Sequence, residues 1–310
     1  MNKVHCFLVL AGLFIAGRAG ATTNLYFTRF EPSEGYDRRY ELVGQKGWVT
    51  DTMSYGGNGL LTNYQGSQAA YVGLFPLDPP TDHISVWQPL NYSPMTKGTP
   101  LVNFSVTMTV VDSTTTNRDD FFFNVYNRQG QCLFTVDFYN VNLGIYYALD
   151  GTNQWVDTGA SFTNDSVYTL GISMDFLRNR WSSTLNGSVL ITNQPMTTTN
   201  ATLDLGDIDA VWVPTDINVP GDNFMIFDNY KVTADPLPPA RLTALGYTSN
   251  RQFLLRLTGP SGARYAIEAT PDFAHWSALK TNTVTDGTFD FIDTGASGFA
   301  RRSYRARLVP

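Results

Sequence analysis

The sequence predicts an all-β protein built from two sandwich domains. Three observations support this fold class. Helical periodicity nowhere persists beyond about two turns, and short alternating apolar and polar runs end at Gly, Asn, Asp or Pro. The composition is 43% hydrophobic and 14% aromatic but only 15% charged. Such a mixture suits half-buried pleated surfaces, because Thr, Asn, Ser and Tyr supply the polarity in place of charge.

Four segments follow one another along the chain. Residues 1–21 have the pattern of a signal peptide, with Lys3 before an apolar run at 7–16 and then Ala19-Gly20-Ala21. This run is too short to span a bilayer, so we expect export followed by cleavage near Ala21, to the periplasm, the cell surface or the medium. A large domain is expected at 22–235, a proline-rich linker at 236–239 and a small domain at 240–310.

Within the large domain, alternation predicts antiparallel strands. They are expected at residues 24–30, 68–74, 102–111, 120–128, 132–139, 144–149, 167–175, 180–185, 189–192, 209–213 and 223–232. Asn186-Gly187 predicts a type I′ hairpin turn, because both central residues of that turn need positive φ. Strands with one apolar face each favour two packed sheets.

The small domain repeats this pattern on a smaller scale. Its strands are expected at residues 240–247, 252–258, 264–270, 277–282, 288–293 and 302–308. Turns are signalled by Gly259-Pro260-Ser261-Gly262 and by Thr285-Asp286-Gly287. We expect a small sandwich of the immunoglobulin or fibronectin III type.

Charge excludes one class of partner for the large domain. Residues 22–239 contain 10 basic and 22 acidic side chains, for a net charge of −12, whereas residues 240–310 contain 9 and 5, for +4. Nucleic-acid binding needs a basic patch that the large domain lacks. The arginines at 301–307 alternate along the last expected strand, which favours a solvated face over an anion site.

Cleavage of the leader would leave Cys132 as the only cysteine. A single cysteine forms no intrachain disulfide, so both domains must be stable through burial alone. The run Gln131-Cys132-Leu133-Phe134 favours a buried, unreactive thiol.

Several motifs of the large domain resemble the concanavalin A-like (laminin G-like) jelly rolls of secreted bacterial proteins. They are Phe30-Glu31-Pro32-Ser33-Glu34-Gly35-Tyr36, Gly44-Gln45-Lys46-Gly47-Trp48, the run from Asn179 to Gly187 and Phe227-Asp228-Asn229-Tyr230-Lys231-Val232. Residues 265–270, Trp276, 289–293 and 301–305 resemble a C-terminal sandwich module of Verrucomicrobia-type secreted proteins. The resemblance implies architecture, since jelly rolls serve lectins, glycosidases, lyases and adhesive domains alike.

This resemblance also frames the catalytic possibilities. Retaining glycosidases of this fold carry two glutamates around an aspartate on one strand, but this chain has no glutamate between residues 42 and 267. Asp207 and Asp209 form a conceivable acidic pair, although a solvated strand edge is the favoured interpretation.

The expected mature chain offers few histidines for catalysis or metal binding. His83 and His275 are the only histidines left, and neither lies in a nucleophile or zinc motif. A lyase could combine His83 with Arg118 or Arg128, so this alternative stays open.

Aromatic side chains in polar loops suggest a sugar-binding site, because sugars stack on Trp or Tyr and hydrogen-bond to neighbouring polar groups. The proline-interrupted segment 77–100 is expected to run over the surface as a binding loop. The candidate ligand-binding residues are Trp87, Tyr92, His83, Asn91 and Trp155. Three other tryptophans are expected in the core, namely Trp48, Trp181 and Trp276.

The resemblance further implies a structural calcium ion between the first and last strands. Glu31, Asp228 and Asn229 lie where such an ion would bind. The alternative is that Glu31 and Asp228 only accept hydrogen bonds from the backbone.

Together these features favour an exported, non-catalytic protein that binds a glycan or mediates surface adhesion. A polysaccharide lyase, an atypical glycosidase and a purely structural envelope or matrix protein are the alternatives. No nucleic-acid partner and no transmembrane segment are expected.

Overall fold

The computed structural model describes residues 21–52, 56–74, 80–152, 154–250 and 252–309. The predicted signal sequence, apart from Ala21, lies outside the described residues. The chain divides into a large compact unit, Thr22–Asp235, and a small one that contains Pro236–Pro310. Both units consist of antiparallel strands, so the predicted all-β fold is confirmed.

Helix is confined to single turns in the described part of the chain. These are η1 (Pro32–Glu34), α1 (Pro94–Lys97) and η2 (Ala296–Gly298). No described helix is long and apolar enough to cross a membrane.

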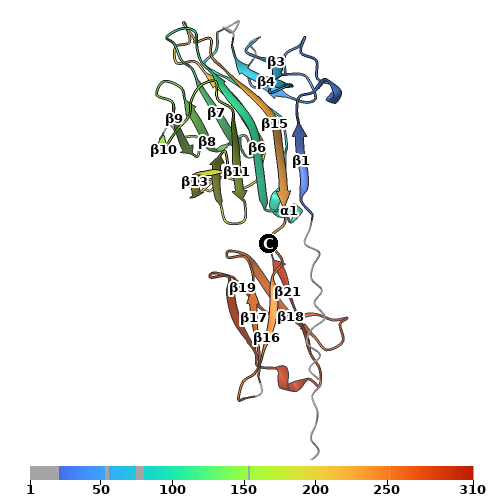
Figure 1. Cartoon of the computed structure of the whole chain (residues 1–310). Helices are drawn as coiled ribbons and strands as arrows, with labels where there is room; N and C mark the ends of the chain where they lie inside the picture. Colours follow the sequence, from blue (N-terminus) through green and yellow to red (C-terminus); the bar gives the residue numbers. More distant parts are fainter. Residues whose placement is uncertain (1–20, 53–55, 75–79, 153, 251, 310) are drawn as a thin grey trace, which may run out of the picture. The chain divides into compact units, whose positions relative to one another are not determined.

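One sheet of the large unit has eight strands, in the order β13-β12-β11-β6-β15-β4-β3, with β1 also paired to β15 (Figure 1). Its strands are β1 (Thr23–Thr28), β3 (Asn58–Tyr64), β4 (Ser67–Gly73), β6 (Leu101–Val111), β11 (Tyr168–Asp175), β12 (Arg180–Leu185), β13 (Ser188–Gln194) and β15 (Phe224–Asp235). The predicted hairpin turn joins β12 to β13, with φ of 50° at Asn186 and 78° at Gly187.

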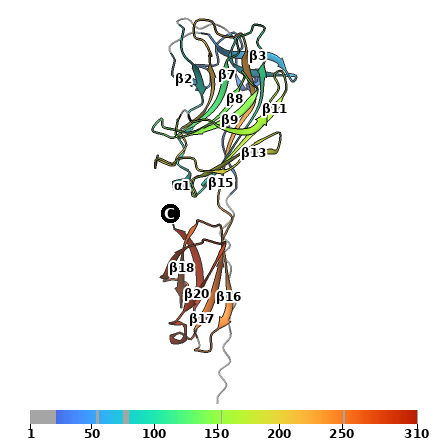
Figure 2. The same ribbon diagram turned by 90° about the vertical axis from the view of Figure 1, so that its left-hand side faces the viewer.

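The other sheet has seven strands, in the order β10-β9-β8-β7-β14-β5-β2. Its strands are β2 (Val49–Thr50), β5 (Ile84–Trp87), β7 (Asp120–Tyr126), β8 (Cys132–Tyr139), β9 (Gly144–Leu149), β10 (Val156–Ser161) and β14 (Asp207–Val213). Strands β7, β8 and β9 form a meander, and Figure 2 shows them side by side.

A single apolar core joins the two sheets into a jelly-roll sandwich. Alternate residues of each strand enter it, and rings from opposite sheets meet there. Phe134 of β8 stacks on Trp181 of β12 with ring centroids 3.9 Å apart, and Phe104 of β6 lies 5.7 Å from Phe123 of β7. Each such aromatic pair adds about 0.5–1.5 kcal/mol to the stabilisation from burial.

The expected core tryptophans divide into two groups. Trp48 and Trp181 are buried, as predicted, and the Trp48 indole donates hydrogen bonds to the hydroxyls of Tyr26 and Tyr36, each at 3.1 Å. Trp276 is only partly buried in the small unit, where the Arg305 guanidinium lies 4.1 Å from its ring centroid. The core prediction is therefore wrong for Trp276.

The small unit contains two three-stranded sheets, β16-β17-β20 and β19-β18-β21. Their strands are β16 (Arg241–Tyr247), β17 (Phe253–Thr258), β18 (Arg264–Thr270), β19 (Ser277–Thr283), β20 (Thr288–Asp293) and β21 (Ser303–Val309). Phe253 and Leu255 of one sheet pack with Ile267 of the other. The two sheets thus share a core, while the immunoglobulin-type assignment stays a prediction.

Candidate functional site

The outer face of the seven-stranded sheet carries the most unusual side chains of the large unit. On β7, Phe121 and Phe123 point into the core, so Phe122 and Asn124 point away from it. We call this side of the sheet the outer face. Its residues are neither uniformly solvated nor apolar.

Strand register brings residues from distant parts of the sequence together on the outer face. Phe122 pairs with Val211 of β14 on one side and with Asp137 of β8 on the other. Asp137 in turn pairs with Tyr146 of β9. Asp120 is a diagonal neighbour of Asp137, at a typical Cα separation of about 7–8 Å.

A second row runs beside the first. Asn124 pairs with Asp209 on β14 and with Thr135 on β8, and the Thr135 hydroxyl donates a hydrogen bond of 2.7 Å to the Asn124 Oδ1 atom. Trp87 follows Val86, the partner of Ala210, so Trp87 and Asp209 are cross-strand neighbours. Four neighbouring strands, β5, β14, β7 and β8, therefore each contribute one residue to this row.

Two carboxyl groups of the outer face are buried without a charge partner. Asp137 and Asp209 are each 4% exposed, and the Oδ1 atom of each has no hydrogen-bond partner among the described residues. The Oδ2 atom of Asp209 accepts a hydrogen bond of 2.5 Å from the Ser85 hydroxyl. Buried polar atoms are usually satisfied, and six other buried side-chain atoms of the described residues also lack a partner; these two oxygens are notable because they share one face.

Burial changes the protonation of this group. It raises the pKa of Asp137 to about 8, with a further contribution from the charge of Asp120. It likewise raises the pKa of Asp120 to about 7 and that of Asp207 to about 6. Burial, followed by the Asp207 charge, raises the pKa of Asp209 well above its usual value. Several carboxyls can therefore carry a proton near neutral pH.

Aromatic rings surround these carboxyls. Trp155 is 42% exposed, and its ring lies 5.5 Å from that of Phe122 at an interplanar angle of 33°. Tyr126, Tyr146 and Trp87 are partly buried on the same face. Partly exposed rings beside polar groups match the signature of sugar binding.

The seven strands contain five aspartates and no lysine or arginine. A candidate cation, His83, directly precedes β5. Its ring contacts Asp51 at 3.0 Å and Asp82 at 2.7 Å. Hydrogen bonding to Asp51 and then to Asp82, against the opposing effect of burial, raises the pKa of His83 to about 9. This histidine is thus a cation at neutral pH, held between two anions.

The interpretation of Asp207 and Asp209 as a solvated strand edge is wrong. Strand β14 lies inside the sheet, between β5 and β7, and Asp209 is almost completely buried. The sequence did not indicate this central position, because β14 lies far along the chain from β5 and β7, its neighbours in the sheet.

The predicted ligand-binding residues divide between two places. Trp87 and Trp155 lie on the outer face, and His83 lies at its edge. Tyr92 instead packs against the core and forms an isolated bridge with Leu205. Asn91 is exposed, with its backbone N–H bonded to the Gly206 carbonyl at 3.0 Å.

The expectation that segment 77–100 is only a surface loop is also wrong for residues 80–100, while residues 77–79 lie outside the described residues. Ile84–Trp87 forms β5, which pairs with β14 and β2, and Ile84 and Val86 are fully buried. The prolines flank this short strand without interrupting its hydrogen bonds.

The residues imagined for a lyase do not bind one another. Arg118 pairs with Asp112 at 3.1 Å. Arg128 donates a hydrogen bond of 3.0 Å to the Ser93 hydroxyl. His83 is held by its two aspartates, so the structure does not join it to either arginine.

The proposed calcium residues approach one another without forming a recognisable metal centre. Asp228 is 3% exposed, and its oxygens accept hydrogen bonds from the backbone and side-chain nitrogens of Asn229 at 2.6 and 3.2 Å. Burial raises the pKa of Asp228 to about 6, with smaller contributions from the charges of Glu31 and Glu34. The Glu31 carboxylate accepts a hydrogen bond from Ser67. The described residues hold no group of three acidic, His or Cys side chains arranged for a metal, and calcium binding stays a prediction.

Cys132 belongs to the outer face but offers no reactive thiolate. It is partly buried, and its sulfur lies 3.6 Å from the Thr135 hydroxyl. Burial raises the pKa of this thiol to about 11, which keeps it protonated at neutral pH.

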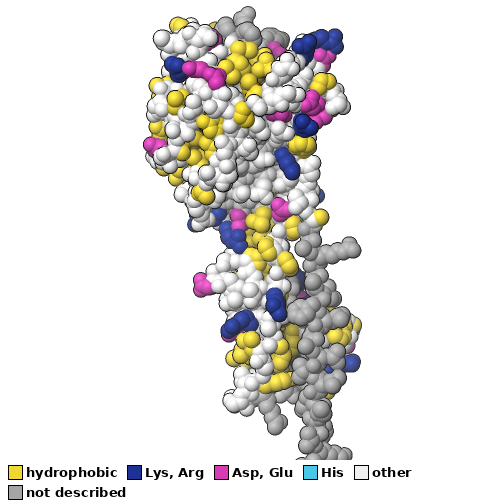
Figure 3. All heavy atoms as spheres, in the orientation of Figure 1, with side chains coloured by type: hydrophobic (Ala, Val, Ile, Leu, Met, Phe, Trp, Pro, Cys, Tyr) yellow, Lys and Arg dark blue, Asp and Glu magenta, His cyan; other side chains and the backbone are white. Residues whose placement is uncertain are grey.

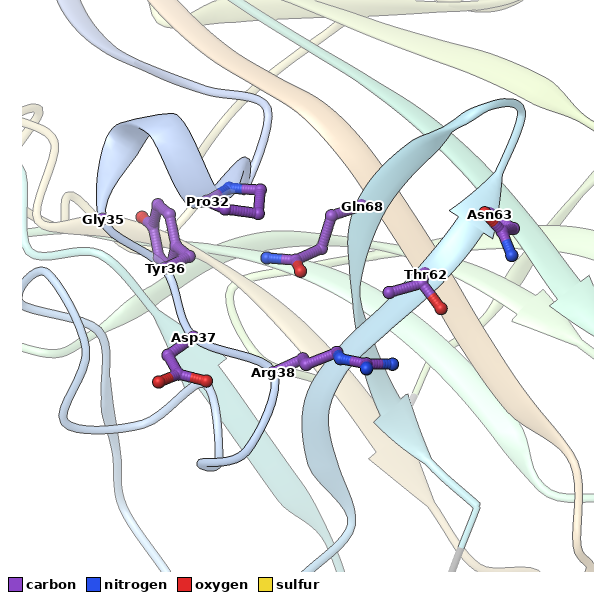
Figure 4. A pocket seen from close by; sticks show the side chains of 8 residues that line it. All are labelled: Pro32, Gly35, Tyr36, Asp37, Arg38, Thr62, Asn63 and Gln68. Carbon is purple, nitrogen blue, oxygen red and sulfur yellow. The ribbon is translucent and has the colours of Figure 1, made fainter.

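An open hollow of about 670 Å³ lies beside η1, away from all the predicted ligand-binding residues (Figure 4). Its lining residues are Pro32, Gly35, Tyr36, Asp37, Arg38, Thr62, Asn63 and Gln68. Tyr36 is the only aromatic residue among them, and it is 4% exposed with its hydroxyl bonded to Trp48. This hollow therefore lacks a stacking surface.

No family model and no curated protein matches the chain. Similar solved structures include a carbohydrate esterase of a Shiga toxin-encoding bacteriophage, with 12% identity, a TM-score of 0.48 and coverage of 69% of this chain and 100% of that one. Another is the cellulose-induced protein Cip1, at 13% identity, TM-score 0.46 and coverage of 67% and 96%. A sialidase matches at 9% identity and TM-score 0.45, over 68% of this chain but only 18% of its own length.

These comparisons correct one prediction. The sequence favoured a non-catalytic protein, but the similar structures include a sialidase, a carbohydrate esterase and alginate lyases. The preference against an enzyme is therefore wrong. At such low identity no particular activity transfers to this chain, and the function has to be argued from its own outer face.

Proposed function

We propose that this protein is exported and acts on a carbohydrate at the outer face of the seven-stranded sheet. One observation carries the proposal. Adjacent strands place buried carboxyls that lack charge partners, Asp137 and Asp209, among the partly exposed rings of Trp155, Trp87 and Tyr146. A face that served only to cover the core would not need these groups.

The chemistry of sugars fits this combination. The C–H face of a pyranose stacks on an aromatic ring, and its hydroxyls both donate and accept hydrogen bonds. The Phe122–Trp155 pair offers a partly exposed ring surface. The Oδ1 atoms of Asp137 and Asp209 are themselves buried, whereas the partly exposed Asp120 and Asn124 offer polar groups beside the rings.

A glycan array with the chain from Thr22 onward tests this proposal. Trp155→Ala should reduce retention on the bound polysaccharide by about tenfold or more, because stacked aromatic side chains dominate such contacts. Tyr40→Ala is the matched control, since Tyr40 is 64% exposed and lies outside the seven strands. Equal losses in both variants, or no glycan bound at all, would contradict the proposal.

Cleavage of a glycosidic bond is the second candidate, and the Asp120–Asp137 pair favours it. Glycosidases use two carboxyls, one of which is protonated at the working pH. Asp137 has the higher pKa of the two and suits the acid, while Asp120 suits the base. Release of new reducing ends would show hydrolysis, and unsaturated ends would show a lyase. Asp137→Asn should abolish hydrolysis, with glycan retention as the control for folding and binding.

A further inference from the structure

We propose that the outer face selects uncharged glycans and rejects acidic polysaccharides. This inference rests on the proposed function and adds the class of ligand.

The two sheets of the sandwich differ in their charges. All seven strands of the seven-stranded sheet lack lysine and arginine, although they carry Asp120, Asp137, Asp157, Asp207 and Asp209. The eight-stranded sheet, in contrast, includes Arg180 and Lys231. Figure 3 shows one face of the molecule, on which scattered basic and acidic side chains lie among hydrophobic and uncharged polar ones.

Three of the basic residues that flank these strands in the sequence are already engaged. Arg118 pairs with Asp112 through Nε at 3.1 Å. Arg128 donates to Ser93 at 3.0 Å and lies 3.8 Å from Asp204. His83 is shared by two aspartates. None of the three would neutralise an acidic sugar without losing an existing partner.

Rejection of acidic glycans follows from this charge distribution. A uronate or sulfate group placed on the outer face would lose hydration without meeting a compensating cation, and a charge that is desolvated without a partner costs free energy. An uncharged hydroxyl meets no such penalty. Specificity would thus come from this penalty on a charged ligand as well as from contacts with an uncharged one.

The buried carboxyls also disfavour a basic glycan. Burial raises the pKa of Asp137 to about 8 and that of Asp209 well above its usual value, so both are neutral at slightly acidic pH. A protonated carboxyl offers an ammonium group no ion pair, but it can donate a hydrogen bond to a sugar oxygen. The face is therefore matched to hydroxyl-rich, uncharged chains.

A binding panel at about pH 6.5 tests the inference with three classes of polymer: neutral β-glucan, xylan and mannan, acidic alginate and polygalacturonate, and basic chitosan. We expect retention on at least one neutral polymer, at least about tenfold above either charged class. If the protein retains an acidic polymer or chitosan better, and Trp155→Ala removes that retention, the site is correct but the inference is overturned. If no polymer is retained, the proposed function itself fails, and the inference fails with it.

A gain-of-charge variant tests the physical cause. Asn124→Arg adds a cation at the centre of the outer face, and Ser105→Arg adds one to a partly exposed position of β6 in the other sheet. With both variants folded by circular dichroism, alginate retention should rise about tenfold for Asn124→Arg only. An equal rise in both, or none in Asn124→Arg, would overturn the inference. If Asn124→Arg does not fold, Asp207→Asn, which removes one negative charge, should raise alginate retention in the same direction.

Discussion

Asp137 in the large unit and Glu268 in the small unit are two carboxyls with equal burial and opposite surroundings. They are 4% and 5% exposed. Glu268 receives hydrogen bonds from the Nε atoms of Arg305 at 2.7 Å and Arg307 at 2.9 Å. Asp137 has an oxygen with no partner among the described residues. The Asp137 carboxyl is thus buried without a compensating partner, whereas two arginines neutralise the Glu268 carboxylate.

The two environments shift the pKa values in opposite directions. Burial raises the pKa of Asp137 to about 8. Burial also acts to raise the pKa of Glu268, but hydrogen bonds from Arg307 and Arg305 outweigh it and lower the value. A buried carboxyl that pairs with two arginines forms a structural ion pair. A buried carboxyl without a partner lowers stability, and such groups cluster at functional sites.

The largest effect on the free energy of unfolding is expected when the Asp137 carboxyl is replaced. The native state keeps a proton on this carboxyl up to about pH 8, whereas the unfolded chain loses it near pH 3.8. The native state therefore loses stability as pH rises across that window. Asp137→Asn removes this cost, so the free energy of unfolding at pH 9 should rise by about 2–5 kcal/mol, with little change near pH 4.

Urea unfolding of the large unit at both pH values measures this effect. Asp157→Asn is a matched control, because Asp157 is exposed on β10 of the same sheet. It should leave the pH dependence of unfolding unchanged. A destabilised Asp137→Asn protein at pH 9 would show that the Asp137 carboxylate has a partner in solution.

A smaller effect of opposite sign is expected at Glu268. Since the native pKa lies below the ordinary value, this carboxylate stabilises the fold above about pH 4.5 and loses that contribution as pH falls. Glu268→Gln should lower the free energy of unfolding of the small unit by about 1–3 kcal/mol at pH 7. The difference should vanish near pH 3, and a constant difference at every pH would assign the loss to packing.

The smallest effect concerns Asp228, whose carboxyl lies between these extremes. The positive charge of Arg29 acts to lower the pKa of Asp228, and the negative charges of Glu31 and Glu34 act to raise it. If calcium binds there, an ion at ten times its Kd should stabilise the large unit by about 1.4 kcal/mol. Thermal unfolding in calcium and in chelator measures the shift. Glu31→Gln and Asp228→Asn should each abolish it, whereas Asp216→Asn should not.

Local patterns predicted most of the strands. The six expected strands of the small unit agree with β16–β21 to within one residue at each end, because Gly, Pro and Asp-Gly turns separate clean alternation. Four strands of the large unit were missed, namely β3, β5, β10 and β2, which has only two residues. Prolines obscure β5, β3 begins with consecutive buried residues, and β10 is mostly exposed without apolar alternation.

The outer face was only half visible in the sequence. Alternation places Thr135 and Asp137 opposite the apolar Phe134 and Val136, so the polar face of β8 was predictable. Its neighbours were not, because β14 joins β7 through long-range pairing that no local pattern encodes. Most strands of the eight-stranded sheet also lack Lys and Arg, so charge did not indicate which strands form one surface.

The absence of lysine and arginine from the strands of the seven-stranded sheet has a consequence for how binding there depends on salt. Dissolved salt screens attraction between charges, with a Debye length that falls from about 30 Å at 0.01 M to about 10 Å at 0.1 M. A binding face that uses no lysine or arginine has little such attraction to lose. We therefore expect retention of an uncharged polymer to change little between low and high salt.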